Sequence, residues 1–179
     1  MQLVSFGGGQ LIARRCFAAA LRRSSSRRFA SNRKSAHYAI PPETVTIDGT
    51  TLHPDELWNI PKSVLGLLER RLLFQEGNPM NLLKRRIVDN LHTQYRKPAS
   101  GSPLFTVVEN MPRVVSVWDN FDSLLTPPDH ISRRPSNTYY VNSNYVLRAH
   151  TSAHQHALIR QGFDNFVCVG DVYRRDEID

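Results

Sequence analysis

Cysteine and long apolar runs are both scarce in this 179-residue sequence. It has two cysteines, Cys16 and Cys168, and only Cys168 lies beyond the first 34 residues. That remainder therefore has no internal disulfide and no zinc site built from cysteines. No run approaches the ~18 apolar residues that a membrane-spanning helix requires, so we expect no membrane partner. A hydrophobic content of 40% and a charged content of 22% are typical of a globular domain, for which this length suffices.

Acidic residues are absent from the first 34 positions, and the first one in the chain is Glu43. The same stretch carries eight of the 23 basic residues. They are Arg14, Arg15, Arg22, Arg23, Arg27, Arg28, Arg33 and Lys34. The other 15 basic residues nearly balance the 16 acidic ones, so the net charge of +7 belongs to the N-terminal stretch. The overall charge is therefore no argument for a nucleic-acid-binding surface on the rest of the chain.

This N-terminal stretch, which we call the leader, combines arginine and serine with scattered apolar residues. That composition is typical of a mitochondrial transit peptide. We expect residues 1–36 to be a disordered transit peptide that is cleaved between about Phe29 and Tyr38. A secretory signal would need an apolar region of ~7–15 residues, and arginines interrupt every candidate here. A basic arm that binds RNA is the remaining alternative.

Two helices are predicted before any long run of strands. Residues 37–78 read as an N-terminal extension with a short strand at Val45–Ile47 and one helix, whose apolar pattern runs from Pro61 to Leu73. A second helix is expected to begin at Pro79, where Asn78 suits the N-cap.

Apolar residues at three- and four-residue spacing carry this second helix to about Tyr95. Between them lies the basic run Lys84-Arg85-Arg86. We interpret this run as the solvated face of the helix, with an RNA contact as the alternative.

The period changes after Lys97, where four segments rich in β-branched and aromatic residues follow. They are 103–109, 113–118, 137–148 and 165–174. A helical run, Thr151–Arg160, separates the last two and ends at Gly162. Helices followed by strands predict an α+β fold with an antiparallel sheet flanked by helices. Because an apolar strand at 166–173 has nothing after it to cover it, we expect the fold to be incomplete at the C-terminus.

Three histidines fall within seven positions in the stretch "RAHTSAHQH". His150 and His154 have the spacing of a zinc-binding helix motif, but Thr151 stands where that motif has its glutamate. A different chemistry is also open, because Thr151 and Ser152 are favoured N-cap residues between a strand and a helix. Unpaired N–H groups at such a junction bind carboxylate or phosphate, although an ordinary cap remains the plain alternative.

A second polar constellation closes the chain, in "GDVYRRDEID". Arg174 and Asp176 are two residues apart, so in a strand they would lie on one face. Arginine is the side chain best suited to bidentate phosphate contacts. A surface ion pair is the alternative interpretation.

Together these segments resemble the catalytic domain of the phenylalanyl-tRNA synthetases, which are class II aminoacyl-tRNA synthetases. The likeness covers about Pro79 to Asp179, and with the leader it is greatest to the single-chain mitochondrial form. "NFDSLLTPPDH" resembles the motif 1 region, with Pro127 at the proline position. "HTSAHQ" resembles the substrate-binding signature, and "VYRRD" resembles the start of motif 2. The family usually has proline where this chain has Ile131.

The resemblance implies a ligase that activates phenylalanine with ATP and transfers it to mitochondrial tRNA(Phe) in the matrix. Arg174 would be the catalytic residue that holds the α-phosphate and the substrate carboxylate, and Asp176 would help to bind ATP. The substrate-binding residues would lie along the amino-acid pocket. They would be His150, Ser152, Ala153, His154 and Gln155. Mg²⁺ would accompany the ATP, and no resident metal site is expected.

Residues 79–179 would then be the first part of the catalytic domain. The end of motif 2, motif 3 and the anticodon-binding domain are missing from the sequence, so we expect this chain alone to be inactive, and a full-length form to be a monomer. Two other functions remain open. One is a non-catalytic mitochondrial RNA-binding or interaction protein derived from the synthetase fold, and the other is a metal-dependent hydrolase built on His150 and His154.

Overall fold

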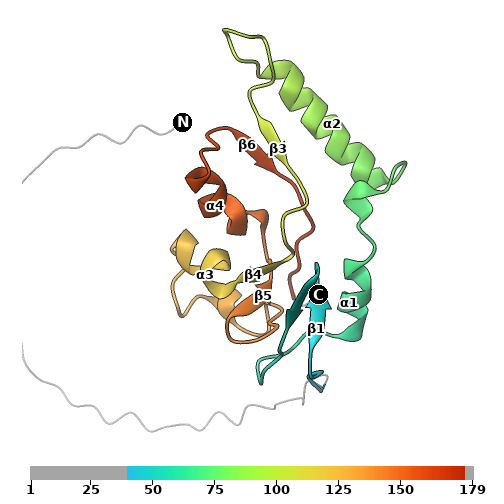
Figure 1. Ribbon diagram of the computed structural model, residues 1–179, viewed down its shortest axis with the longest axis vertical. Coiled ribbons are helices and arrows are strands. Elements are labelled where there is room, and N and C mark those ends of the chain that lie inside the picture. The colour runs from blue at the N-terminus through green and yellow to red at the C-terminus, as the bar shows by residue number, and fades with distance from the viewer. Residues whose placement is uncertain (1–39, 176–179) are drawn as a thin grey trace, which may run out of the picture. The chain divides into compact units, whose positions relative to one another are not determined.

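The computed structural model describes residues 40–175 (Figure 1). The transit peptide expected at residues 1–36 and the ATP contact expected of Asp176 lie outside the described residues. The helices are α1 (Lys62–Leu68), α2 (Pro79–Gln94), α3 (Val117–Asn120) and α4 (Gln155–Arg160). Short 3-10 turns connect them: η1 (Leu72–Phe74), η2 (Asp122–Leu124), η3 (Ile131–Arg133) and η4 (Thr151–His154). The strands are β1 (Val45–Ile47), β2 (Thr50–Leu52), β3 (Thr106–Val108), β4 (Val114–Ser116), β5 (Tyr145–Leu147) and β6 (Phe166–Cys168).

Helix α2 has the start that the sequence predicts. The Asn78 side chain accepts a hydrogen bond of 3.0 Å from the Met80 N–H, and Pro79 occupies the first turn, where its missing N–H costs nothing. The preceding helix is shorter than predicted, because α1 ends at Leu68 and Arg71 adopts a left-handed conformation before η1. The apolar pattern up to Leu73 is therefore divided between a helix and a turn.

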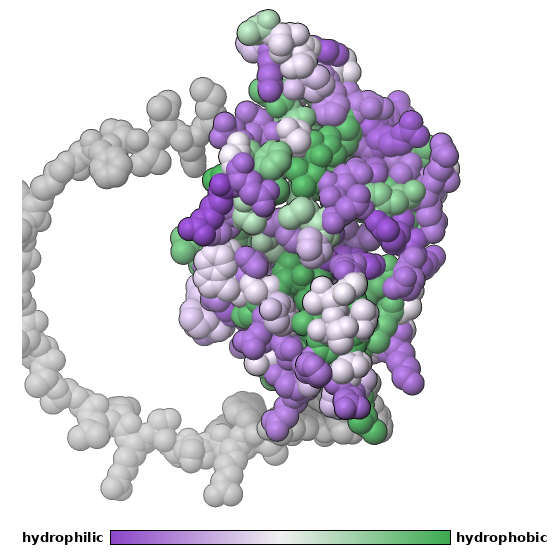
Figure 2. All heavy atoms as spheres, viewed as in Figure 1, coloured by the Kyte–Doolittle hydropathy of each residue, from purple (hydrophilic) through white to green (hydrophobic). Residues whose placement is uncertain are grey.

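The apolar side of α2 is only partly covered. It borders a groove of about 560 Å³ that also meets residues 167–172, and Figure 2 shows hydrophobic side chains gathered in this region between α2 and the β3–β6 pair. On the basic run, Lys84 forms an ion pair of 3.1 Å with Glu109 and lies over the Phe74 ring, whereas Arg85 and Arg86 are exposed. One of the three basic groups is thus held within the fold.

Within residues 40–175 the strands pair as three two-stranded sheets, two antiparallel (β1–β2 and β4–β5) and one parallel (β3–β6). The sequence predicted antiparallel pairing, which the β3–β6 pair contradicts. β-branched composition predicts strands but not their direction, which depends on the path of the chain between them. The strand predicted as far as residue 174 ends at Cys168, because its partner β3 ends at Val108.

Strand β5 lies at the centre of the core, and its alternating side chains serve two hydrophobic clusters. Val146 packs with Val115, Tyr140 and Ala153, whereas Leu147 packs with the larger cluster. The larger cluster contains Ile47, Leu52, Trp58, Ile60, Leu68 and Val141. Complete burial of one such side chain contributes about 1.5–3 kcal/mol. Residues 45–68 therefore share one core with the strand that precedes the histidine cluster.

Asn59 joins the N-terminal part of this core to a loop far along the chain. Its side-chain amide donates to the carbonyl oxygens of Pro135 (2.8 Å) and Thr138 (2.9 Å). Its side-chain oxygen accepts from the Tyr140 N–H at 2.7 Å. Because Asn59 is buried, water cannot replace these hydrogen bonds, and the amide therefore holds the loop in one place.

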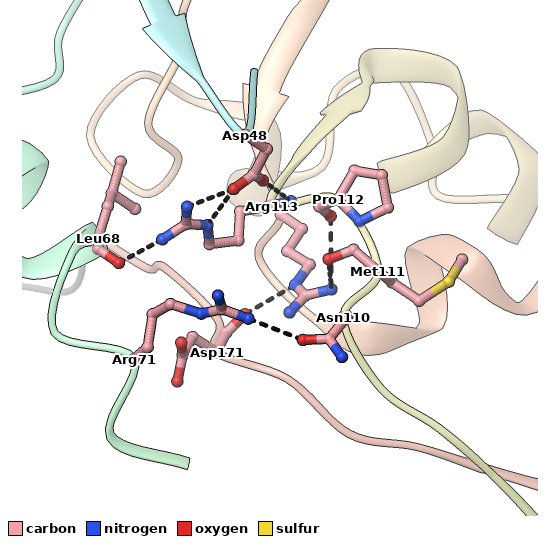
Figure 3. A network of polar contacts seen from close by, with 9 residues as sticks. Asp48, Leu68, Arg71, Asn110, Met111, Pro112, Arg113 and Asp171 are labelled. Carbon is pink, nitrogen blue, oxygen red and sulfur yellow. Dashed lines mark hydrogen bonds and ion pairs between the residues drawn. The ribbon is translucent and has the colours of Figure 1, made fainter. Parts of the chain in front are cut away.

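An ion pair provides a second connection over long sequence distance (Figure 3). Arg113 donates to the Asp48 carboxylate and to the Leu68 carbonyl oxygen. Burial alone would raise the pKa of the Asp48 carboxyl, but the hydrogen bonds and charge of Arg113 outweigh it and lower that pKa. The turn between β1 and β2 is thereby tied to the residue that precedes β4.

Candidate active site

A cavity of about 460 Å³ brings together His150 and Arg174. The loop that resembles motif 1 forms another side of it, and Asn137, Thr138 and Ala149 complete the lining. The loop residues are Phe121, Leu124, Leu125, Thr126, Pro127, His130, Ile131 and Ser132. An imidazole and a guanidinium facing one cavity are donors suited to carboxylate and phosphate oxygens.

Local hydrogen bonds shape the motif 1 loop. The Ser116 hydroxyl caps α3 by accepting from the Asp119 N–H at 2.9 Å. The His130 imidazole caps η3 in the same way, accepting from the Ser132 N–H at 3.2 Å. Ile131, where the resemblance leads us to expect proline, is the first residue of η3. Proline is favoured at such a position, and here the His130 cap supports the turn without it.

Asn120 supports the segment that leads to His150, and sequence analysis missed it. This residue is fully buried, and its side-chain oxygen accepts a hydrogen bond of 3.1 Å from the Ala149 N–H. Nothing in "WDNF" marks this asparagine as buried, so the sequence offered no signal for its role.

His150 is the N-cap residue of η4, and its surroundings favour the neutral imidazole. Burial lowers the pKa of this group first, and the positive charge of Arg174 lowers it further. Its Nδ1 atom is buried and has no hydrogen-bond partner among residues 40–175. A neutral imidazole with an unused nitrogen at a cavity can receive a hydrogen bond from, or donate one to, a ligand.

The other residues of the substrate-binding signature are not gathered around this cavity. Ala153 and His154 are buried, whereas Ser152 and Gln155 are exposed and do not line it. The capping expectation for Thr151 and Ser152 is wrong, because η4 already begins at Thr151 and His150 occupies the N-cap position without a side-chain bond. The substrate contacts implied for these residues stay predictions.

Arg174 is exposed, and backbone hydrogen bonds on both sides of it place the segment that carries it. The Tyr173 N–H donates to the Arg148 carbonyl oxygen at 2.9 Å, and the Arg175 N–H donates to the Asn137 carbonyl oxygen at 3.0 Å. The segment is thus held against the end of β5 without being a strand. Its phosphate-binding role also stays a prediction.

Residues 40–175 contain no group of three or more His, Cys, Asp or Glu side chains arranged to hold a metal ion. Over the same residues, no helix has the length and apolarity needed to cross a membrane.

Comparison with known proteins gives a family for the larger part of the chain. Residues 79–179 match the family described as tRNA synthetases class II core domain (F). The relatives to which the chain is similar include phenylalanine--tRNA ligases of eukaryotes. The probable mitochondrial ligase of Drosophila melanogaster is 42% identical over 155 residues, which are 87% of this chain and 34% of the relative.

The mitochondrial ligase of Mus musculus is 43% identical over 82% of this chain and 32% of its own length. The chloroplastic/mitochondrial ligase of Arabidopsis thaliana is 42% identical over 68% of this chain and 27% of its own length. The chain therefore spans 27–34% of the length of these relatives.

Proposed function

Because this chain belongs to the class II core domain family of tRNA synthetases, we propose that it supplies part of the active site of a mitochondrial phenylalanine--tRNA ligase. The observation that carries the proposal is the cavity shared by His150 and Arg174, since these residues stand in the two segments that resemble the family's signatures. The substrates would be phenylalanine, ATP and tRNA(Phe), and the whole protein would work as a monomer in the mitochondrial matrix.

In the proposed reaction the phenylalanine carboxylate attacks the α-phosphate of ATP, and pyrophosphate leaves. Negative charge accumulates on the phosphate oxygens in the transition state, so catalysis depends on positioning and on donors preset for that charge. The Arg174 guanidinium would bind the α-phosphate and the carboxylate together. His150, which lines the same cavity, would orient the amino acid through its neutral imidazole.

Mg²⁺ accompanies ATP in reactions of this kind, but the cavity is unsuited to holding it. The described residues that line it include neither aspartate nor glutamate, and Mg²⁺ prefers carboxylate and water oxygens. No step of this mechanism therefore depends on a metal ligand from residues 40–175.

A chimera tests the proposal. Residues 40–175 would replace the matching segment of the Mus musculus ligase, and phenylalanine-dependent exchange of pyrophosphate into ATP would be measured. Arg174→Ala should lower kcat/KM by the equivalent of ~2.7–4 kcal/mol, the loss typical of one transition-state donor. Arg160→Ala is the matched control, because this exposed arginine of α4 does not line the cavity.

Near-normal kcat/KM in the Arg174→Ala chimera would overturn the role of this residue. An inactive parent chimera whose segment still binds tRNA would favour the alternative of a non-catalytic RNA-binding protein.

The proposed mitochondrial location is tested separately. Residues 1–40 fused to a reporter should direct it into mitochondria, because arginine-rich, acid-free leaders act as import signals. Replacing Arg14, Arg15, Arg22 and Arg23 with glutamate should abolish import, and replacing them with lysine is the control that keeps the charge. Import that persists after the glutamate changes would exclude a charge-based signal.

A further inference from the structure

Arg148 is a buried cation that follows β5 directly, and only 2% of its surface is exposed. Its Nε donates to the Asp171 carbonyl oxygen at 2.7 Å, and its Nη1 donates to the Met111 carbonyl oxygen at 3.1 Å. Figure 3 shows Met111 and Asp171 on two sides of this network. Among residues 40–175 no carboxylate forms an ion pair with Arg148. The guanidinium is therefore satisfied by neutral acceptors, which fix its plane without neutralising it.

Gly170 lies directly against this guanidinium. A Cβ atom at position 170 would be 1.9 Å from Nη2 of Arg148 and 2.7 Å from its Cζ. Only glycine allows the backbone of residues 169–171 to approach so closely. The φ angle of Gly170 is not positive, so contact with Arg148 is the physical reason for glycine here.

His154 completes the arrangement from the other side. Its Nε2 is 3.0 Å from Nη1 of Arg148, and only 6% of the residue is exposed. A guanidinium only donates hydrogen bonds, so Nε2 must accept and the ring proton must lie on Nδ1. Burial lowers the pKa of this imidazole first and the charge of Arg148 lowers it further, which keeps it neutral.

We propose that Arg148 and His154 are positioning residues that hold residues 171–175, which include Arg174, against η4 and its N-cap residue His150. In this arrangement His154 makes no contact with substrate. Arg148 reaches both parts at once, since its carbonyl oxygen receives the Tyr173 N–H while its side chain binds Asp171 and His154. Arg174 is thereby fixed relative to the cavity through residues that do not line it. The inference rests on the proposed function for its consequence in catalysis, but its geometry can be tested without it.

Lysine could not replace Arg148. An ammonium has the charge but not the planar fork that reaches Asp171 with one nitrogen and His154 with another. Glutamine, by contrast, can replace His154, because its side-chain oxygen can accept from Nη1 at nearly the position of Nε2. His154→Leu removes the acceptor at similar volume, so the two variants differ mainly in that bond.

The first test uses the 179-residue chain itself. Nitrogen-15 NMR of the imidazole should find the His154 proton on Nδ1, and hydrogen exchange at the Tyr173 amide should be slow. His154→Leu should speed that exchange at least about tenfold, the effect of losing one hydrogen bond to a charged group. His154→Gln should restore protection, and amides of α2 serve as the internal control. A proton on Nε2, or unchanged exchange in both Arg148→Lys and His154→Leu, would overturn the proposal.

The second test measures pyrophosphate exchange in the chimera. His154→Leu should lower kcat about tenfold or more and change the KM for phenylalanine less than about twofold, because a misplaced Arg174 weakens transition-state contacts. His154→Gln should recover most of the loss. A raised KM with unchanged kcat would make His154 a substrate ligand and refute the proposal. An inactive parent chimera would count against the proposed function alone, since hydrogen exchange at the Tyr173 amide still decides the positioning role.

Discussion

Helix α2 and the region around β5 differ in what holds them. Of the 16 residues of α2 only Asn81 is buried, and its apolar Met80, Leu83 and Ile87 are about half exposed, at 48%, 54% and 50%. β5 has three residues, yet Val146 and Leu147 are fully buried and are followed by the buried Arg148. The longest helix among residues 40–175 therefore contributes little to the core, whereas a strand of three residues contributes two fully buried side chains.

The difference shows that regularity and burial have separate causes. α2 has a cap, proline in its first turn and a backbone ladder, all of which are local. β5 depends on residues far along the chain, because its neighbours include β4, residues 45–68 and the 170–175 segment. Substitutions in the two regions should accordingly have very different effects.

The largest contrast is expected for matched leucine truncations. Leu147→Ala should lower the free energy of unfolding by about 2–5 kcal/mol, because it removes a fully buried side chain and leaves a cavity. Leu83→Ala on α2 should change it by less than about 1 kcal/mol, since that side chain is half exposed. Urea unfolding of both variants measures the two values. Equal losses would contradict the contrast between the regions.

A smaller effect is expected where the β5 region meets residues 169–171. Gly170→Ala should cost about 1–3 kcal/mol, because the new methyl group must displace the anchored Arg148 guanidinium. Gly66→Ala in α1 is the control, since a Cβ there meets no atom within 4 Å and alanine favours a helix. Thermal unfolding should lower Tm for the first variant and not for the second. An unchanged Tm for Gly170→Ala would show that Arg148 is free to move.

The smallest effect is expected from acid. The pKa values of His150 and His154 are lowered by burial first and then by Arg174 and Arg148 respectively. The unfolded chain therefore binds more protons below its histidine pKa of about 6.5, and stability is lost as pH falls from there through the folded values. The stabilisation from the Asp48 carboxyl, whose pKa is also lowered, is present above its ordinary value of 3.8 and is lost only as the pH falls below it.

Urea unfolding between pH 7 and pH 5 should record this decline. The double variant His150→Gln, His154→Gln should flatten it. A wild-type chain of constant stability over this interval would contradict the neutral, buried state of the two imidazoles.

Features coded by neighbouring residues could be predicted from the sequence. The helix from Pro79 is confirmed because Asn78 and the three- and four-residue spacing act within a few residues. The strand at Val45–Ile47 is confirmed for the same reason, since Asp48 and Gly49 make its turn locally. Parallel pairing of β3 with β6 and the end of β6 at Cys168 could not be predicted, because both depend on where a distant strand lies.

The candidate site likewise has a part that the sequence predicted and a part that it could not. Motif likeness pointed to His150 and Arg174, and both line one cavity. The spacing of His150 and His154 suggested one shared role, but the two imidazoles face different surroundings. The orientation of His154 depends on Arg148, whose guanidinium is fixed by the carbonyl oxygen of Asp171. No pattern within the histidine cluster contains that information.

The shared core also has a consequence for the order in which the chain can fold. Ile47 packs in one cluster with Leu147, and Asn59 binds the backbone around residue 140, so the core closes across roughly one hundred residues. Contacts this distant slow folding because the intervening chain must be ordered first. The N-terminal part of the core therefore cannot close until residues 140–147 have joined it. Until then Trp58 and Ile60 remain accessible to chaperones.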